Sequence, residues 1–140
     1  MQELRVERSI WIDASRERVW SAITDAEQLG VWFAPGSKWE ILSLKIGGVV
    51  KFYNTETDIA VHTIEVLNPP NEFTLSWEEQ GKPMLTTFLL KEENNGTRVT
   101  IIESGFEMLP AEIRQRRVDE TSKGYEYSLE NLKSHVERKL

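Results

Sequence analysis

Residues 73–103 of the chain read FTLSWEEQGKPMLTTFLLKEENNGTRVTIIE. Apolar and polar side chains alternate through Phe73, Leu75 and Trp77. A period of two is typical of a β-strand that buries one face. Gly81, with the polar residues around it, ends this strand in a turn. The stretch therefore begins with a half-buried strand.

Two more strands follow it, at residues 84–90 and 97–103. Asn95-Gly96 separates them and predicts a tight hairpin, because both residues tolerate a positive φ angle. Upstream, turn signals rich in Gly, Pro and Asn bound three further strands. These strands cover residues 39–44, 49–53 and 59–67. Six short strands joined by turns predict an antiparallel meander.

Before the meander, the sequence predicts one more strand and two short helices. Residues 3–12 alternate like a half-buried strand. Ser15 suits the N-cap of a first helix, and Asp25, three residues before Gln28, suits the N-cap of a second. Pro35-Gly36 ends the second helix.

The tail, residues 110–140, predicts one long helix. Its apolar positions share one helical face, namely Tyr125, Leu129, Leu132 and Val136. Gly124 lies among residues that favour helix formation, and it has two interpretations. It either kinks or breaks the helix, or it allows something bulky to approach the helix backbone closely.

These elements predict an α+β fold and a single domain over residues 1–140. An antiparallel sheet with one apolar face needs a cover, and the long helix is the obvious candidate. We expect a curved, seven-stranded antiparallel sheet that grips the C-terminal helix. The two short helices lie between the first and second strands.

Composition excludes several classes of function. Lys and Arg total 17 against 23 Asp and Glu, so the formal net charge is −6 and a uniformly basic nucleic-acid binder is excluded. The chain has no Cys, which excludes disulfides, thiolate zinc sites and cysteine nucleophiles. Neither a secretory segment nor a membrane-spanning run is present, and we expect a cytoplasmic protein with no nucleic-acid partner.

Six segments, in chain order, carry a family resemblance. They are Glu17–Asp25, Trp32-Phe33, Gly47-Gly48, Glu65-Val66 with Pro69-Pro70 and Phe73–Trp77, Gly96–Val99, and Gly124-Tyr125 with Leu129 and Leu132. Together they resemble the helix-grip or START-like superfamily (SRPBCC), in the branch similar to the C-terminal domain of the activator of heat-shock protein 90 ATPase. The resemblance spans about residues 5–137. It implies a cavity between the concave face of the sheet and the C-terminal helix, often used for apolar ligands.

Motifs for metal binding or catalysis are missing from the sequence. His62 and His135 lack metal-ligand spacing, so we expect no metal, and no catalytic residue can be named. Glu65 and Glu78 lie between apolar strand positions and have two interpretations. Either they point outward and are solvated, or one points inward with a raised pKa and acts as an acid or base. Arg114, Arg116 and Arg117 lie among acidic residues and predict a solvated helix face or a docking surface for an acidic partner.

The five Trp, five Phe and three Tyr are better candidates for a site. The predicted ligand-binding residues are Trp32, Phe33, Phe52, His62, Phe73, Trp77, Phe88 and Tyr125. Five of their rings should enclose one volume, namely Phe52, Phe73, Trp77, Phe88 and Tyr125. The side chains expected to offer the ligand a hydrogen bond, as polar handles, are Tyr125, Tyr53 and His62. Trp11 and Trp39 are expected at the rim or surface, and Trp20, Trp32 and Phe33 should pin the short helices. The alternative is a densely packed core without a cavity.

Three functions remain open. The first is a binding domain for an apolar or aromatic small molecule, without a cofactor. The second, which rests on the resemblance, is a chaperone co-factor that stimulates the ATPase of heat-shock protein 90. The third is an enzyme of cyclase, dehydratase or hydrolase type, which would need an inward acid or base in the cavity.

Overall fold

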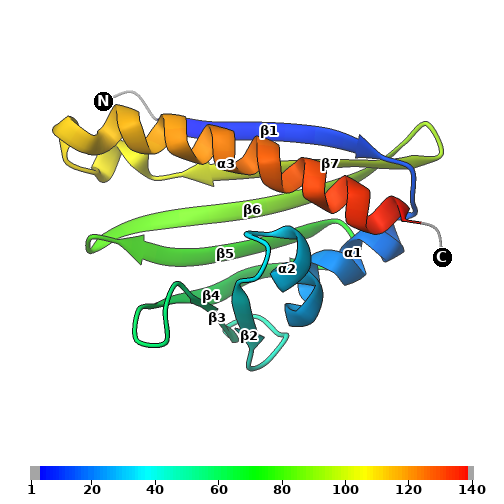
Figure 1. The fold of residues 1–140 in the computed structure, drawn as a ribbon, viewed down its shortest axis with the longest axis horizontal. Coiled ribbons are helices and arrows are strands. Elements are labelled where there is room, and N and C mark those ends of the chain that lie inside the picture. Colours follow the sequence, from blue (N-terminus) through cyan, green and yellow to red (C-terminus); the bar gives the residue numbers. More distant parts are fainter. Residues whose placement is uncertain (1–3, 139–140) are drawn as a thin grey trace.

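A computed structural model describes residues 4–138, so Glu3 of the predicted first strand and residues 139–140 of the predicted last helix lie outside the described residues. Seven antiparallel strands form one sheet in the order β1-β7-β6-β5-β4-β3-β2 (Figure 1). The elements are β1 (Arg5–Ile12), α1 (Arg16–Thr24), α2 (Ala26–Trp32), β2 (Lys38–Ile41), β3 (Val49–Tyr53), β4 (Ile59–Asn68), β5 (Glu72–Glu79), β6 (Lys82–Glu93), β7 (Gly96–Ser104), the 3-10 helix η1 (Phe106–Met108) and α3 (Ala111–Glu137). The predicted α+β helix-grip arrangement is confirmed.

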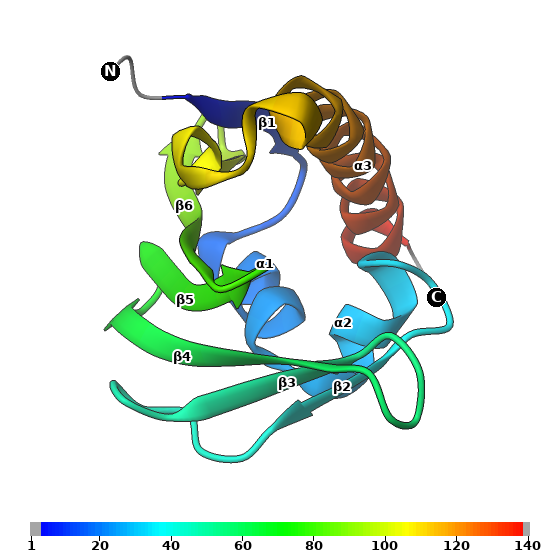
Figure 2. The ribbon, with the colours of Figure 1, turned by 90° about the vertical axis from the view of Figure 1, so that its left-hand side faces the viewer.

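The short helices carry the chain from one edge of the sheet to the other. At one edge β1 pairs with β7, with Ile10 opposite Val99, and at the other edge β2 pairs with β3. Ser15 caps α1 by accepting a hydrogen bond from the backbone N–H of Arg18, as predicted, and Asp25 caps α2 through the N–H of Glu27. Figure 2 shows both helices beside the curved sheet, near one end of α3.

The strand predicted at residues 39–44 is shorter than expected. β2 ends at Ile41, which lies opposite Val50, and the backbone N–H of Leu42 donates to the carbonyl of Val49. Residues 43–48 then form the loop of this hairpin, so Leu44 cannot pair with β3 and its side chain is exposed.

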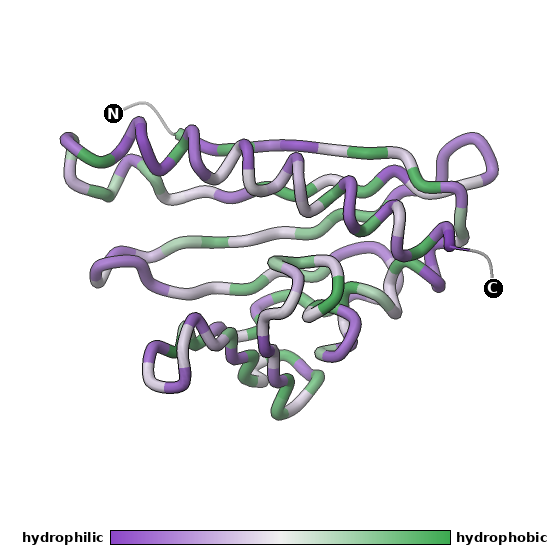
Figure 3. The backbone as a smooth tube through the Cα atoms, in the orientation of Figure 1, coloured by the Kyte–Doolittle hydropathy of each residue, from purple (hydrophilic) through white to green (hydrophobic). Residues whose placement is uncertain are grey.

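Helix α3 runs from Ala111 to Glu137 without a break at Gly124, so the interpretation of Gly124 as a helix break is wrong. Its buried face carries Tyr125, Leu129, Leu132 and Val136, as the spacing predicted. Figure 3 shows hydrophilic and hydrophobic positions interrupting one another along this helix. One face of α3 therefore covers the sheet, while the other remains polar.

Candidate functional site

A cavity of about 620 Å³ lies between the sheet and α3. Strands β2 to β7, the segment that follows α2, and the first half and middle of α3 supply its walls. Figure 2 shows the backbone arrangement around it, with α3 facing the curved sheet. The most exposed of the lining residues are Ala34, Asn54, Gly124 and Tyr127. They place the mouth of the cavity between the loop after α2, the loop between β3 and β4, and helix α3.

A connected set of aromatic rings forms part of the cavity wall. Trp39 of β2 lies 4.7 Å from Phe52 and 6.2 Å from His62, measured between ring centroids. His62 in turn lies 5.6 Å from Trp77 of β5. Phe33, directly after α2, bridges Trp39 at 5.2 Å and Tyr125 of α3 at 6.2 Å. Rings from five strands and helices therefore meet around one space.

Six of the eight predicted site residues line this cavity, namely Phe33, Phe52, His62, Trp77, Phe88 and Tyr125. Trp32 and Phe73 do not line it; both are buried in the core, with 0% and 1% of their surface exposed. Trp32 packs beneath α1 and donates its indole N–H to the carbonyl of Ala22. Phe73 stacks on Phe88 and contacts Trp20, at the end of β5 that α1 covers. Four of the five rings expected around one volume therefore share it, and Phe73 does not.

Two other aromatic residues lie elsewhere than the sequence suggested. Trp39, expected at the rim or surface, lines the cavity. It lies opposite Phe52 of β3, and its indole packs between Phe33 and Phe52. Tyr53, expected as a polar handle, is not part of the cavity wall, and its hydroxyl donates to Glu40 across the β2–β3 edge at 2.8 Å.

The polar end of the cavity is built around Glu103 of β7, which is 2% exposed. The hydroxyl of Tyr125 donates to Oε1 of Glu103 at 2.6 Å, and the hydroxyl of Thr86 donates to the same oxygen at 2.5 Å. The indole N–H of Trp77 donates to the Thr86 hydroxyl at 3.0 Å. Among the described residues, Oε2 of Glu103 has no hydrogen-bond partner.

Burial raises the pKa of Glu103 from 4.5 to about 7, although the hydrogen bonds from Thr86 and Tyr125 act in the opposite direction. Desolvation penalises the charged carboxylate more than these donors stabilise it. Burial, together with the adjacent Glu103, also raises the pKa of Tyr125 well above its ordinary value, so its hydroxyl stays a donor. Burial lowers the pKa of His62, which is therefore neutral at pH 7. The cavity thus contains one carboxyl group that changes charge near neutral pH.

One ion pair forms part of the same wall. The guanidinium of Arg117 binds Glu79 through two contacts, of 2.5 and 2.6 Å. Because both side chains line the cavity, the expectation of a fully solvated face for the arginines of α3 is wrong at this position. Arg117 turns toward the sheet, where Glu79 at the end of β5 offers a bidentate partner.

The outward interpretation of Glu65 and Glu78 is confirmed, since both side chains are exposed. Sequence reasoning missed Glu103, although a signal was available. Alternation along β7 places Val99, Ile101 and Glu103 on one face, and all three are buried. A carboxylate on the apolar face of a strand was the inward acid that the third functional hypothesis required.

Gly124 has a clear role in the shape of the cavity. A Cβ atom built on Gly124 would meet no heavy atom within 4 Å, and the residue lines the cavity. No described protein group therefore approaches the helix here, so the bulky neighbour that the sequence suggested is not part of the described protein. The glycine leaves open space at the cavity mouth.

Among residues 4–138, no group of three or more His, Asp or Glu side chains is arranged to hold a metal ion. Within the same range, every helix is too short or too polar for a membrane crossing. The described arrangement can hold an apolar or aromatic body against its rings, and it offers that body a hydrogen bond or a proton at Glu103.

The chain matches a known protein family and several solved structures. The family described as "Activator of Hsp90 ATPase homolog 1-like protein" matches residues 13–137. No curated protein matches the sequence. Protein MLL2253 from Mesorhizobium loti has a similar structure, with a TM-score of 0.83, 16% identity, and coverage of 98% of this chain and 99% of the other.

Two further solved structures show the same fold. Protein BH1534 from Bacillus halodurans gives a TM-score of 0.77 at 22% identity and covers 98% of this chain and 100% of its own. The Aha1 dimer from Colwellia psychrerythraea gives a TM-score of 0.73 at 18% identity, with 96% of each chain covered.

Proposed function

The chain belongs to the family of Activator of Hsp90 ATPase homolog 1-like proteins, and from that premise we propose that it binds an apolar or aromatic small molecule in the cavity between the sheet and α3. One observation carries the proposal, namely a cavity of about 620 Å³ with a cluster of aromatic rings in its wall and a group of polar side chains around Glu103 at one end. Small-molecule sites typically have this size and this distribution of polar groups.

The proposal can be tested by blocking the cavity. Gly124→Leu places a side chain into the open space at the mouth, whereas Lys123→Leu adds the same side chain at the neighbouring exposed position of α3. Native mass spectrometry of the purified protein, followed by solvent extraction, identifies what co-purifies. We expect a bound small molecule with the natural chain and with Lys123→Leu, and its loss with Gly124→Leu.

An equal amount of the small molecule on both variants would contradict binding in this cavity. Co-purification of a chaperone in place of a small molecule would instead favour the role named in the family's description, and the ATPase rate of that chaperone with and without this protein would then measure the effect.

Glu103 favours a second candidate, acid–base catalysis in the same cavity. A buried carboxyl group whose pKa is raised to about 7 can both give and take a proton near neutral pH. The test is consumption of a compound from a metabolite extract, followed by mass spectrometry. Glu103→Gln should abolish consumption without abolishing binding, because the amide has nearly the same shape but cannot transfer the proton. Equal consumption by both proteins would remove Glu103 from the reaction.

A further inference from the structure

Glu103 has a hydrogen-bonding capacity that the described protein leaves unused. The Thr86 hydroxyl accepts from the indole of Trp77, so its own hydrogen is directed to Oε1 of Glu103. Tyr125 donates to the same oxygen. Both acceptor sites of Oε1 are then occupied, and when the carboxyl group is protonated its hydrogen lies on Oε2. A buried O–H without an acceptor costs free energy, which a ligand can recover by supplying one.

The charges around Glu103 disfavour an anion in the cavity. From α3, Arg117 is engaged by Glu79 of β5, so this pair contributes little net charge. Tyr125 of α3 and His62 of β4 are neutral at pH 7. From β6 and β1, the residues opposite Glu103 are Thr86 and Val6, and neither of them ionises. A ligand therefore meets one carboxyl group that is negatively charged in part of the molecules near pH 7, and no unengaged cation is among these neighbours.

We propose that the ligand is an uncharged aromatic compound whose carbonyl oxygen accepts a hydrogen bond from the protonated Oε2 of Glu103. This inference rests on the proposed function and adds the chemical class of the ligand. An uncharged body suits the ring-lined wall, because burying a charged group there without a partner is costly. The protonated acid carries its hydrogen on Oε2, so it needs an acceptor rather than a donor from the ligand.

Binding of such a ligand is linked to proton uptake. Because the pKa of Glu103 in the free protein is about 7, most molecules carry the proton at pH 6 and few carry it at pH 8. The protonated fraction falls about tenfold between these two values, so the affinity for a carbonyl ligand should fall about tenfold as well. A ligand without the carbonyl group should show little change.

The experiment uses benzophenone and diphenylmethane, which share two aromatic rings and differ in the carbonyl group. Calorimetric titration at pH 6 and pH 8, in buffers of different ionisation enthalpy, gives the Kd and the number of protons taken up. For the natural chain we expect benzophenone to bind about tenfold more weakly at pH 8 than at pH 6. At pH 8 its binding should take up close to one proton. Diphenylmethane should change less than about twofold and take up none.

Two variants separate the proposed hydrogen bond from Oε2 of Glu103, here called the anchor, from binding in the rest of the cavity. Glu103→Gln presents an amide N–H₂ in place of Oε2–H, so benzophenone should bind to it equally at pH 6 and pH 8 without proton uptake. Glu78→Gln, an exposed carboxylate on β5, should keep the pH dependence of the natural chain.

The outcomes are distinct. If each probe binds, and the Kd of each is the same at pH 6 as at pH 8, the cavity binds ligands but the anchor is overturned. Tighter binding of benzophenone at pH 8 would also overturn it, since the carboxylate rather than the acid would then favour the ligand. If neither probe binds, the proposed function fails together with the anchor.

Discussion

The two halves of α3 face the same sheet and serve opposite purposes. Toward its C-terminus, Leu129, Leu132 and Val136 are packed into the core. Toward its middle, Arg117, Gly124 and Tyr125 border a cavity. A closely packed interior stabilises a fold, whereas an unfilled space loses the contacts that packing would provide. The difference separates a part of the helix that holds the structure together from a part that is available to a ligand.

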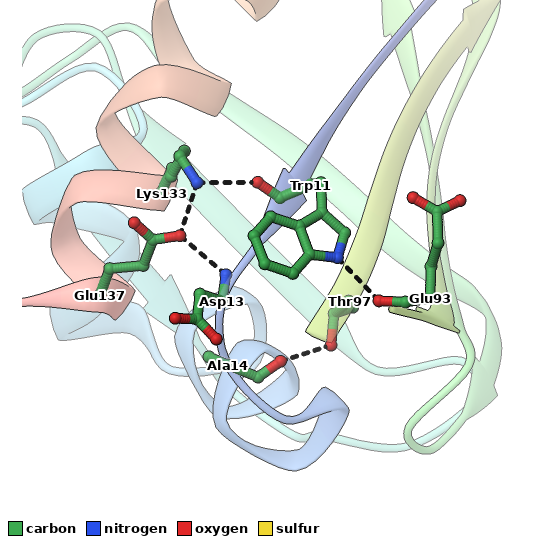
Figure 4. A network of polar contacts seen from close by, with 7 residues as sticks. All are labelled: Trp11, Asp13, Ala14, Glu93, Thr97, Lys133 and Glu137. Atoms are coloured by element: carbon green, nitrogen blue, oxygen red, sulfur yellow. Dashed lines mark hydrogen bonds and ion pairs between the residues drawn. The ribbon is translucent and has the colours of Figure 1, made fainter. Parts of the chain in front are cut away.

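Polar contacts reinforce the packed end, as Figure 4 shows. Lys133 donates to the backbone carbonyl of Trp11 at 3.0 Å and pairs with Glu137 at 2.6 Å. Glu137 accepts from the backbone N–H of Asp13 at 2.7 Å, and Thr97 donates to the carbonyl of Ala14 at 2.8 Å. The contacts of Lys133 and Glu137 tie the end of α3 to β1 and the turn that follows it, and Thr97 ties β7 to the same turn. The cavity end, in contrast, leaves Oε2 of Glu103 without a partner in the described residues.

The largest expected effect tests the packed end. Leu132→Ala removes a side chain with 0% exposure from the core and should lower the free energy of unfolding by about 2–5 kcal/mol, since it leaves a cavity in a close-packed region. Urea denaturation monitored by circular dichroism measures the loss. A change below about 1 kcal/mol would mean that this half of α3 is no better packed than the other.

The next effect tests the cavity end through Glu103. Its pKa rises from 4.5 to about 7 on folding, so the folded protein holds this proton more tightly, and stability falls as the pH rises from about 4.5 to 7. Glu103→Gln removes that penalty and should stabilise the protein by up to about 3 kcal/mol at pH 8, with a much smaller gain at pH 4.

Unfolding in urea at the two pH values measures this difference, and Glu78→Gln is the control with an exposed carboxylate. A gain of the same size at both pH values would show that the effect comes from packing rather than from the buried charge.

A smaller effect tests the polar contacts of the packed end. Glu137→Gln weakens the bond to the N–H of Asp13 and the pair with Lys133 and should cost about 1 kcal/mol at pH 7. These same contacts, led by the Asp13 N–H, lower the pKa of Glu137. The stability they supply is therefore present above the unfolded pKa and is lost as the pH falls through the folded pKa. Thermal unfolding over a series of pH values from 7 downward should show a loss that is largest at pH 7 and shrinks as the pH falls.

The smallest effect returns to Gly124, which lies in the helix at the cavity mouth. Gly124→Ala should raise the free energy of unfolding by about 0.5–1 kcal/mol, because alanine favours the helix and the added Cβ meets no atom within 4 Å. Lys123→Ala at the exposed neighbouring position is the control, with a change close to zero. If Gly124→Ala is destabilising, the space at the mouth is less open than the geometry indicates.

The amino-acid sequence by itself determined the seven strands, the three α-helices and their order. Alternation in residues 73–103, the Asn95-Gly96 turn, and the caps at Ser15 and Asp25 act over a few residues, so each can be recognised without knowledge of the rest of the fold. The apolar face of α3 follows for the same reason. The resemblance of the six segments then favoured a helix-grip sheet with a cavity beneath the last helix.

Only the tertiary structure decided which inward residues border that cavity. Phe73 and Trp77 share one face of β5, yet the first lies in the core under α1 and the second lines the open space. Trp39 joined the wall because its ring packs between Phe52 of β3 and Phe33 after α2, and Arg117 joined it because Glu79 lies within reach. The alternation along a strand predicts the face on which a side chain lies. The distance between α3 and the curved sheet, in contrast, depends on residues far apart in the chain. For the same reason, the raised pKa of Glu103 follows from burial among β1, β6 and α3 and could not be read from β7 alone.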